Sequence, residues 1–170
     1  AILLERCRLW PQNAPWTRAM ARVFYGSASG LPAEPDWTLS GYWQTCPAGD
    51  VDGDGFDDLF AGSLAGLQVF YGSPAGPVPG EPWPGPSVSL AAAGDVNGDG
   101  FDDLVAGDPF FTAGQAWEGR ILVYHGSPAG PSVEPNAMFQ SDYEGLRLGT
   151  RVLAAGDVNG DGYADFVAAR

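Results

Sequence analysis

Short apolar runs alternate with turn residues along most of the chain. Three such runs, at residues 58–62, 103–107 and 165–169, begin at an Asp and contain consecutive apolar positions with Gly or Ala at their ends. Runs of this length with small flanking residues are typical of buried β-strands. No segment shows a sustained helical period, and no apolar run approaches the length of a membrane span. The pattern predicts an all-β protein.

A second pattern recurs out of phase with the first. Residues 23–27, 69–73 and 123–127 each start with Val, continue with aromatic or His residues, and end in Gly-Ser. β-Branched and aromatic residues favour strands, whereas the Gly, Ser and Pro residues that follow favour turns. Repeats of about 45 to 60 residues that hold several strands each indicate the blades of a β-propeller.

We expect four antiparallel strands in each blade. The first strand precedes an acidic segment (near 43–47, 88–93 and 150–155) and the second follows it. The third is the Val-aromatic run, and the fourth is a more polar run such as 36–40 or 137–141. The expected division is an irregular segment over 1–20, a half-blade over 21–41, blades over 42–87 and 88–142, and a half-blade over 143–170.

The acidic segments are near copies of one nonapeptide, at residues 50–58, 95–103 and 157–165. Each has oxygen-bearing side chains at positions 1, 3, 5 and 9 and Gly at position 6. Hard divalent cations take many oxygen ligands, at about 2.3–2.6 Å for calcium. Carboxylates crowded together without a cation would repel one another. The matched spacing favours calcium loops over solvated Asp-Gly turns.

An EF-hand loop begins with similar spacing, but it needs a bidentate acid at position 12 and a helix that carries it. Position 12 of the three copies is Ala61, Ala106 or Ala168, none of which offers a side-chain oxygen. The residues after each copy are the expected strands. The loops are therefore predicted to join two strands, and an EF-hand is rejected.

The loops and the strands around them resemble the FG-GAP repeat, which builds the propellers of integrin alpha subunits and of many bacterial extracellular proteins. The loops carry the specific part of the resemblance, together with residues 103–109 and 119–127, and the whole covers roughly residues 20–170. The Phe-Gly and Gly-Ala-Pro signatures that name the family are degraded here to Leu148-Gly149 and 107–109.

The resemblance implies one calcium ion per loop, about three per chain, held by side chains at positions 1, 3, 5 and 9 and by the backbone carbonyl of position 7. The first site would then comprise Asp50, Asp52, Asp54, Phe56 and Asp58. The second would comprise Asp95, Asn97, Asp99, Phe101 and Asp103. The third would comprise Asp157, Asn159, Asp161, Tyr163 and Asp165.

The composition fits this interpretation. The 170 residues include 25 Gly and 15 Pro, typical of short strands joined by tight turns. The formal net charge is −13, and much of it lies in the proposed loops. Three bound divalent cations would cancel about half of this charge, and the acidity argues against nucleic-acid binding. The basic residues are all Arg, four of them within the first 22 positions.

Cys7 and Cys46 are the only cysteines. A disulfide between them and a pair of free thiols are both compatible with the sequence. An oxidising compartment and millimolar calcium would both place the protein outside the cell or at its surface. The first ten residues are too short and too charged for a signal peptide. Because the sequence has no initiator Met, we expect that a leader has been removed or that the chain is an excised piece.

The expected strands amount to about three blade equivalents, whereas propellers usually close with about four to eight. The pieces at the two ends of the chain are complementary halves of one blade. Either the chain is a fragment of a longer propeller, or several copies complete a ring or a filament by exchanging strands. Self-association is therefore expected, and membrane insertion is not.

Catalytic residues are scarce. His125, the only histidine, occupies the position of Tyr71 in the strand repeat, which favours a packed or edge-exposed imidazole over a catalytic base. No nucleophile is paired with a base, so no catalytic residue and no organic cofactor site is expected. We expect Trp37 and Trp83 to pack between blades. Trp117, on an insertion over 108–119, is the best candidate for contact with a protein or glycan ligand, with a hydrophobic cover over a blade as the alternative.

The leading hypothesis from the sequence is a non-enzymatic, calcium-stabilised extracellular propeller module, similar to those of integrins, that serves in cell adhesion, surface recognition or self-assembly. The alternative is a piece or accessory domain of an extracellular enzyme that degrades polysaccharides or lipids, or a lectin-like glycan binder.

Overall fold

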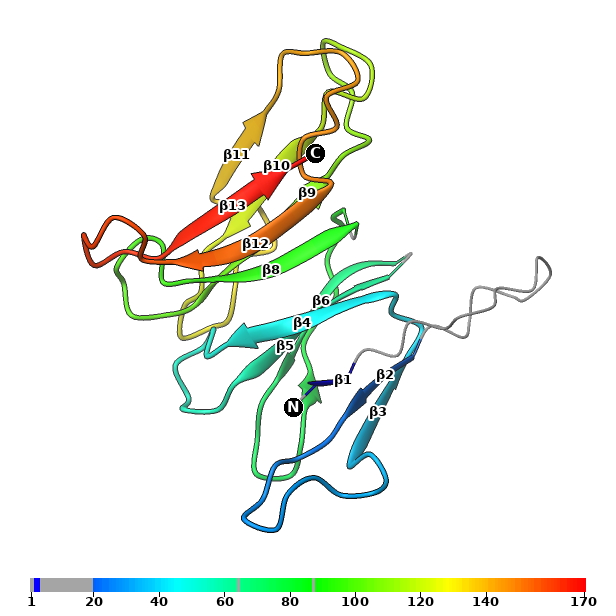
Figure 1. The fold of residues 1–170 in the computed structure, drawn as a ribbon, viewed down its shortest axis with the longest axis vertical. Coiled ribbons are helices and arrows are strands. Elements are labelled where there is room, and N and C mark those ends of the chain that lie inside the picture. The colour runs from blue at the N-terminus through cyan, green and yellow to red at the C-terminus, as the bar shows by residue number, and fades with distance from the viewer. Residues whose placement is uncertain (1, 4–19, 64, 87) are drawn as a thin grey trace, which may run out of the picture.

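The computed structural model describes residues 2–3, 20–63, 65–86 and 88–170. All regular secondary structure in these residues is β-strand, arranged as a row of antiparallel sheets that follow one another along the chain (Figure 1). Within the described residues, no helix is long and apolar enough to cross a membrane. The all-β prediction is confirmed.

Four sheets make up the row. The first has the strand order β1-β2-β3, with β1 (Ile2–Leu3), β2 (Met20–Val23) and β3 (Trp37–Ser40). The second has the order β4-β5-β6-β7, with β4 (Gln44–Gly49), β5 (Asp58–Ser63), β6 (Gly66–Tyr71) and β7 (Val78–Pro79). The third has the order β11-β10-β9-β8, with β8 (Ser89–Gly94), β9 (Asp103–Asp108), β10 (Arg120–Tyr124) and β11 (Ala137–Gln140). The fourth pairs β12 (Arg151–Gly156) with β13 (Asp165–Ala169).

Two of these sheets are complete four-stranded antiparallel sheets of the kind that form propeller blades. In each of them the chain runs from one edge strand to the other without a crossover. The segments after the acidic loops are the strands β5, β9 and β13, as predicted, so the rejection of an EF-hand is confirmed.

The sequence analysis did not locate two of the strands, although it expected a fourth strand in the blade over 42–87. The edge strand β7 has only two residues, both exposed, and one of them is Pro, so no apolar pattern marks it. Strand β1 lies within the segment 1–20 that was expected to be irregular, and it pairs with β2 through Ile2↔Val23 and Leu3↔Arg22.

In the second, third and fourth sheets, the first strand ends in a β-bulge. The pairing of β4 with β5 shifts between Pro47 and Gly49, and the pairs β8–β9 and β12–β13 shift at the equivalent positions. Gly49 has φ 73, which residues with a Cβ rarely adopt, and the equivalent Gly94 has φ 81. The bulge turns the chain out of the sheet at the point where each acidic loop begins.

The apolar core lies between neighbouring sheets. Between the second and third sheets, Phe60 stacks on Trp83 with ring centroids 6.1 Å apart, and Trp83 meets the edge of Tyr124 at 5.9 Å. Between the first and second sheets, Trp37 meets the edge of Phe70 at 5.4 Å. The predicted packing of Trp37 and Trp83 between sheets is therefore confirmed.

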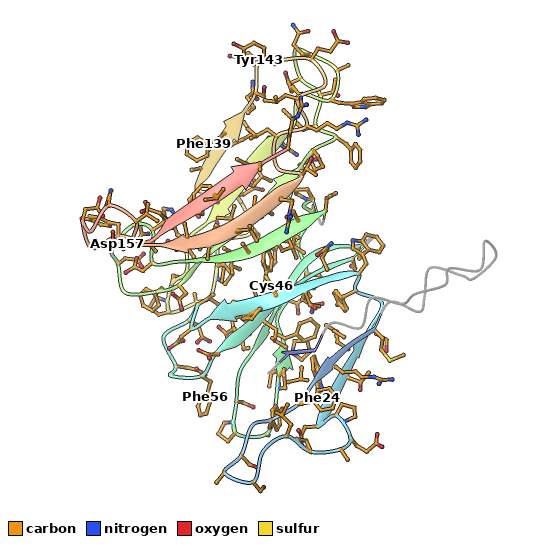
Figure 2. The ribbon with its side chains drawn as sticks, viewed as in Figure 1. Phe24, Cys46, Phe56, Phe139, Tyr143 and Asp157 are labelled. Atoms are coloured by element: carbon orange, nitrogen blue, oxygen red, sulfur yellow. The ribbon has the colours of Figure 1, made fainter. Side chains whose placement is uncertain are left out.

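Cys46 lies on β4, as Figure 2 shows, and packs against the core between the second and third sheets. Burial raises the pKa of its thiol to about 12, so the thiol stays protonated at neutral pH. Cys46 is a free cysteine in the structure, and Cys7, its possible disulfide partner, lies outside the described residues. The pairing of these two cysteines stays a prediction.

The position of the core between sheets can be tested with Phe60→Ala. Phe60 is fully buried, so this change should lower the free energy of unfolding by about 3–5 kcal/mol. Phe110→Ala is the matched control, because Phe110 is 58% exposed and its truncation should change stability by about 0.5 kcal/mol or less. Urea unfolding measures both variants, and equal losses would contradict a core centred on Phe60.

Candidate metal centre

The three acidic loops lie at the same edge of the row of sheets (Figure 1). Each loop joins the first strand of a sheet to the second, between β4 and β5, β8 and β9, or β12 and β13. The repeated strand order brings loops that are far apart in the sequence to neighbouring places. In this way the sheets position the predicted ligands.

The first Asp of each loop organises the backbone around its carboxylate. The carboxylate of Asp50 accepts hydrogen bonds from the backbone N–H groups of Gly53, Asp54 and Gly55, at 2.7, 3.1 and 2.9 Å. Asp95 and Asp157 accept the same set of bonds in their own loops. These backbone donors hold the pKa of the Asp157 carboxyl below its usual value, so it is ionised at neutral pH.

The ninth-position Asp ties the loop to the third strand. Asp58 accepts hydrogen bonds from the N–H of Val51 at 2.9 Å and from the N–H of Gly72, which follows β6, at 2.7 Å. Asp103 accepts the equivalent pair from Val96 and Gly126, both at 2.9 Å. Both residues are buried, being 1% and 0% exposed. A buried carboxylate needs such donors to offset lost hydration.

Burial also changes the protonation of these carboxyls. It raises the pKa of Asp58 to about 6, although the N–H donors of Gly72 and Val51 oppose the rise. The pKa values of Asp103 and Asp52 are raised too, again mainly by burial. A bound cation would favour the ionised forms and oppose these shifts.

In the first loop the structure brings three predicted ligands together. One carboxylate oxygen each from Asp50, Asp52 and Asp58 lies within 4.8 Å of the other two. Three carboxylate oxygens converging at this separation fit the preference of calcium for anionic oxygen ligands. The carboxylate of Asp54 instead accepts a hydrogen bond from the N–H of Phe56 at 2.8 Å.

The second and third loops repeat this backbone with Asn at position 3. The amide oxygens of Asn97 and Asn159 accept the N–H of Asp99 and Asp161, each at 2.9 Å. Their amide nitrogens donate to the carboxylates of the same two Asp residues, at 2.8 and 2.9 Å. The ligand roles of the side chains in all three loops, and of the carbonyls of Phe56, Phe101 and Tyr163, stay predictions.

Neighbouring loops contact each other, which the sequence analysis did not foresee. The carboxylate of Asp102, at position 8 of the second loop, accepts the N–H of Asp50 at 2.9 Å, and the N–H of Asp102 donates to the carbonyl of Asp50 at 3.1 Å. The ring of Phe101 lies against Gly53 and leaves no room for a Cβ there. The shared acid at position 8 of the first two loops was the signal that could have revealed this contact.

The third loop meets the second in the same manner. The N–H of Ala164 donates to the carbonyl of Asp95 at 2.9 Å, and the ring of Tyr163 lies against Gly98. Because position 8 is Ala here, the carboxylate contact is missing and the backbone bond remains. The first and second loops are therefore each supported by the loop of the next sheet.

His125 lies beside the second loop. Its Nδ1 is 2.9 Å from the amide nitrogen of Asn97, and its backbone N–H donates to the side chain of Asn136 at 2.8 Å. The histidine thus takes part in the contacts that surround the proposed metal ligands.

The insertion between β9 and β10 is held in shape by a buried carboxylate. Glu118 is buried, and its carboxylate accepts the N–H groups of Ala113, Gly114 and Gln115 at 2.7, 3.2 and 3.1 Å. Burial alone would raise the pKa of Glu118, but these three donors lower it overall. The carboxylate thereby fixes the shape of the loop that carries Trp117.

Comparison with known families supports the repeat. The model of the FG-GAP repeat matches residues 87–124 and 149–170, which contain the second and third loops and the strands around them. No curated protein matches the chain. The fold is therefore of the propeller-blade class, and the matched segments are similar to FG-GAP repeats, which confirms the resemblance seen in the sequence. The segment with the first loop lies outside this match, although its backbone hydrogen bonds are the same.

The raised pKa of Asp58 predicts how stability depends on pH in a chelator. Its folded-state pKa of about 6 lies above the ordinary value of 3.8, so protonation favours the folded state. This contribution is complete below pH 3.8 and is lost as the pH rises through about 6. The free energy of unfolding, measured in urea, should therefore be higher near pH 5 than near pH 7.5. The gain in the free energy of unfolding from pH 7.5 to pH 5 should be smaller in Asp58→Asn and unchanged in the exposed control Asp142→Asn.

Proposed function

We propose that this chain is a non-enzymatic propeller module that binds about three calcium ions, one in each acidic loop. The observation that carries the proposal is the convergence of carboxylate oxygens from Asp50, Asp52 and Asp58 within 4.8 Å, in a loop whose backbone pattern recurs twice more. The FG-GAP repeats matched at two of the loops support it, because such repeats often bind calcium.

Calcium would act as a structural clamp at the edge of each sheet. The proposed ligands come from both ends of each loop, so one ion would hold the end of the first strand to the start of the second. Binding to the folded state alone stabilises a protein by mass action. An affinity in the range of about 10⁻⁴–10⁻³ M would suit extracellular modules.

The proposed setting is outside the cell or at its surface, where calcium is abundant and where FG-GAP repeats occur. The proposed role is adhesion, surface recognition or self-assembly. Self-association is part of the proposal, and the exposed apolar side chains of the fourth sheet, which include Leu153 and Val167, support it.

Calcium binding can be tested by titration calorimetry. Uptake of about three ions per chain is expected, and at 100 times Kd each site should stabilise the fold by about 2.7 kcal/mol. Asp157→Ala should remove one site, because the first Asp organises its loop, whereas Asp142→Ala should keep all three. A chelator should lower Tm. No binding heat and no change in Tm would contradict the proposal.

A lectin-like role has one specific observation in its favour. Phe110 and Trp117, on the insertion, are 58% and 52% exposed, and the Arg147 guanidinium lies 5.9 and 5.0 Å from their ring centroids. An exposed aromatic pair beside a cation is a surface on which a sugar ring or a protein side chain can stack. In this second candidate function, the insertion contacts a glycan and the calcium loops hold the scaffold.

Trp117→Ala separates this role from a purely structural one. In a glycan-array experiment with calcium present, a lectin would bind defined glycans and lose at least about tenfold in affinity on this change. Trp43→Ala, which truncates the same side chain outside the insertion, should keep the binding. Absence of any glycan binding by the unmodified protein would remove the second candidate. Hydrolysis of a polysaccharide or lipid by the purified chain would contradict the non-enzymatic proposal.

A further inference from the structure

The second acidic loop contacts the first through a residue that lies between two of its own proposed ligands. Asp102 stands between Phe101 and Asp103, which are proposed to bind calcium through a carbonyl and a carboxylate. The carboxylate of Asp102 accepts the N–H of Asp50 at 2.9 Å, and the N–H of Asp102 donates to the carbonyl of Asp50 at 3.1 Å. One residue of the second loop therefore holds both backbone polar groups of the first proposed ligand in the neighbouring loop.

Two glycines give the second loop room to approach the first. A Cβ built on Gly49 would lie 1.9 Å from Oδ2 of Asp102, so a side chain there would block the carboxylate. A Cβ built on Gly53 would lie 2.6 Å from the ring of Phe101. The residue at position 49 thus serves two purposes, since its φ of 73 forms the bulge and its missing side chain admits the neighbouring loop.

A second route joins the buried ninth-position acids of the two loops. Gly126, which follows β10, donates its N–H to Asp103 at 2.9 Å. The next residue, Ser127, donates its N–H to the carbonyl of Val51 at 3.0 Å. Val51 is fully buried, and its own N–H donates to Asp58 at 2.9 Å. Both ends of the first loop are therefore connected to the second loop by hydrogen bonds.

The contact between the second and third loops repeats this arrangement without the carboxylate. Ala164 takes the place of Asp102, and its N–H donates to the carbonyl of Asp95 at 2.9 Å. Gly94 has φ 81, close to that of Gly49, and a Cβ built on it would lie 2.8 Å from the Cβ of Ala164. The chain thus contains the same contact with and without an acid at position 8.

The position of Asp102 makes its contact with Asp50 sensitive to the state of the second loop. Without a cation, the carboxylates of that loop repel one another. Ligation through Phe101 and Asp103 would fix the chain on both sides of Asp102. A fixed Asp102 would hold Asp50 in place before the first loop binds its own ion. Less ordering would then accompany binding, which raises affinity.

We propose that Asp102 is a positioning residue that couples the first two loops, so that calcium in the second loop raises the affinity of the first. The inference rests on the calcium binding of the proposed function and adds that these two sites are not independent. By linkage, calcium in the first loop raises the affinity of the second by the same factor. Coupling between sites typically changes affinity by about 5–150-fold.

The sign of the coupling distinguishes this role from a simple effect of charge. Two divalent cations repel each other, so electrostatics alone would make the second ion bind more weakly. Salt at physiological concentration screens this repulsion over about 8 Å. Charge alone therefore gives negative coupling or none, and a positive coupling reports on the contacts between the loops.

Nuclear magnetic resonance during titration with calcium can follow each loop separately. The Gly at position 6 of each loop donates its N–H to the first Asp of that loop, so the amide signals of Gly55, Gly100 and Gly162 report on their own loops. An affinity of about 10⁻⁴–10⁻³ M suits such a titration. The measurement gives a Kd for each loop in the whole chain.

Asp99→Ala tests whether the first loop depends on the second. Asp99 is a proposed ligand, and its hydrogen bonds to the described residues lie within its own loop. Without an ion in the second loop, the affinity of the first should fall at least about fivefold. Asp161→Ala, the same change in the third loop, should alter the affinity of the first far less. An unchanged or tighter first site in Asp99→Ala would overturn the proposal.

A double-mutant cycle tests the role of Asp102 itself. In an Asp102→Ala background, the effect of Asp99→Ala on the first loop should shrink at least about twofold. Asp102→Asn keeps an oxygen that can accept the N–H of Asp50 but removes the charge, so it should retain the coupling. Asp57→Ala, which removes an equal charge beside the first loop, should retain it as well. An equal loss of coupling in Asp102→Ala and Asp102→Asn would contradict positioning through this hydrogen bond.

Ala164→Asp tests the same contact by gain of affinity. An Asp at position 164 should supply the missing acceptor for the N–H of Asp95, and the second loop should bind calcium at least about twofold more tightly. Addition of Asp161→Ala should remove this gain, because the third loop would no longer bind an ion. No gain in Ala164→Asp would contradict the role assigned to the acid at position 8.

The titrations also separate this inference from the proposed function. Uptake by all three loops, with a first-loop Kd that does not depend on the second loop, would refute the coupling and leave the calcium proposal standing. No uptake by any loop would contradict both.

Discussion

The buried carboxylates of Asp58 and Asp103 determine how the complete sheets are assembled. Each accepts one N–H from its own loop and one from the glycine after the third strand, so a single side chain joins three strands at one edge. Removal of either carboxylate would leave buried N–H donors without acceptors. Burial also makes the ionised carboxylate costly, and raises the pKa of Asp58 to about 6. The same residue is thus both a structural anchor and the proposed ligand of a cation that would lower this cost.

The second constraint is that the apolar clusters of the described residues lie between sheets. Apolar side chains meet between sheets, as Phe60 and Trp83 do against Tyr124, and neighbouring loops support one another through Phe101 and Asp102. Such a fold is stabilised by contacts between neighbours, in the manner of other repeat proteins.

The acidic loops and the insertion that carries Trp117 lie at opposite ends of the strands. The acidic loops precede the second strands, whereas the insertion with Phe110 and Trp117 follows β9 at the other end. The Glu118 carboxylate holds this insertion through three backbone hydrogen bonds without any metal. The proposed calcium clamp and the aromatic surface can therefore be changed independently by mutation.

The sequence by itself determined the local structure. The Val-aromatic runs and the apolar runs after each Asp gave the long strands, because strand formation depends on residues close together in the chain. The nonapeptide gave the candidate ligands for the same reason. The tertiary structure alone decided the rest. The short strand β7 carries no pattern, and β1 is set by pairing with residues about twenty positions away. The contact of Asp102 with Asp50 joins residues 52 positions apart, and only the stacking of whole sheets brings them together.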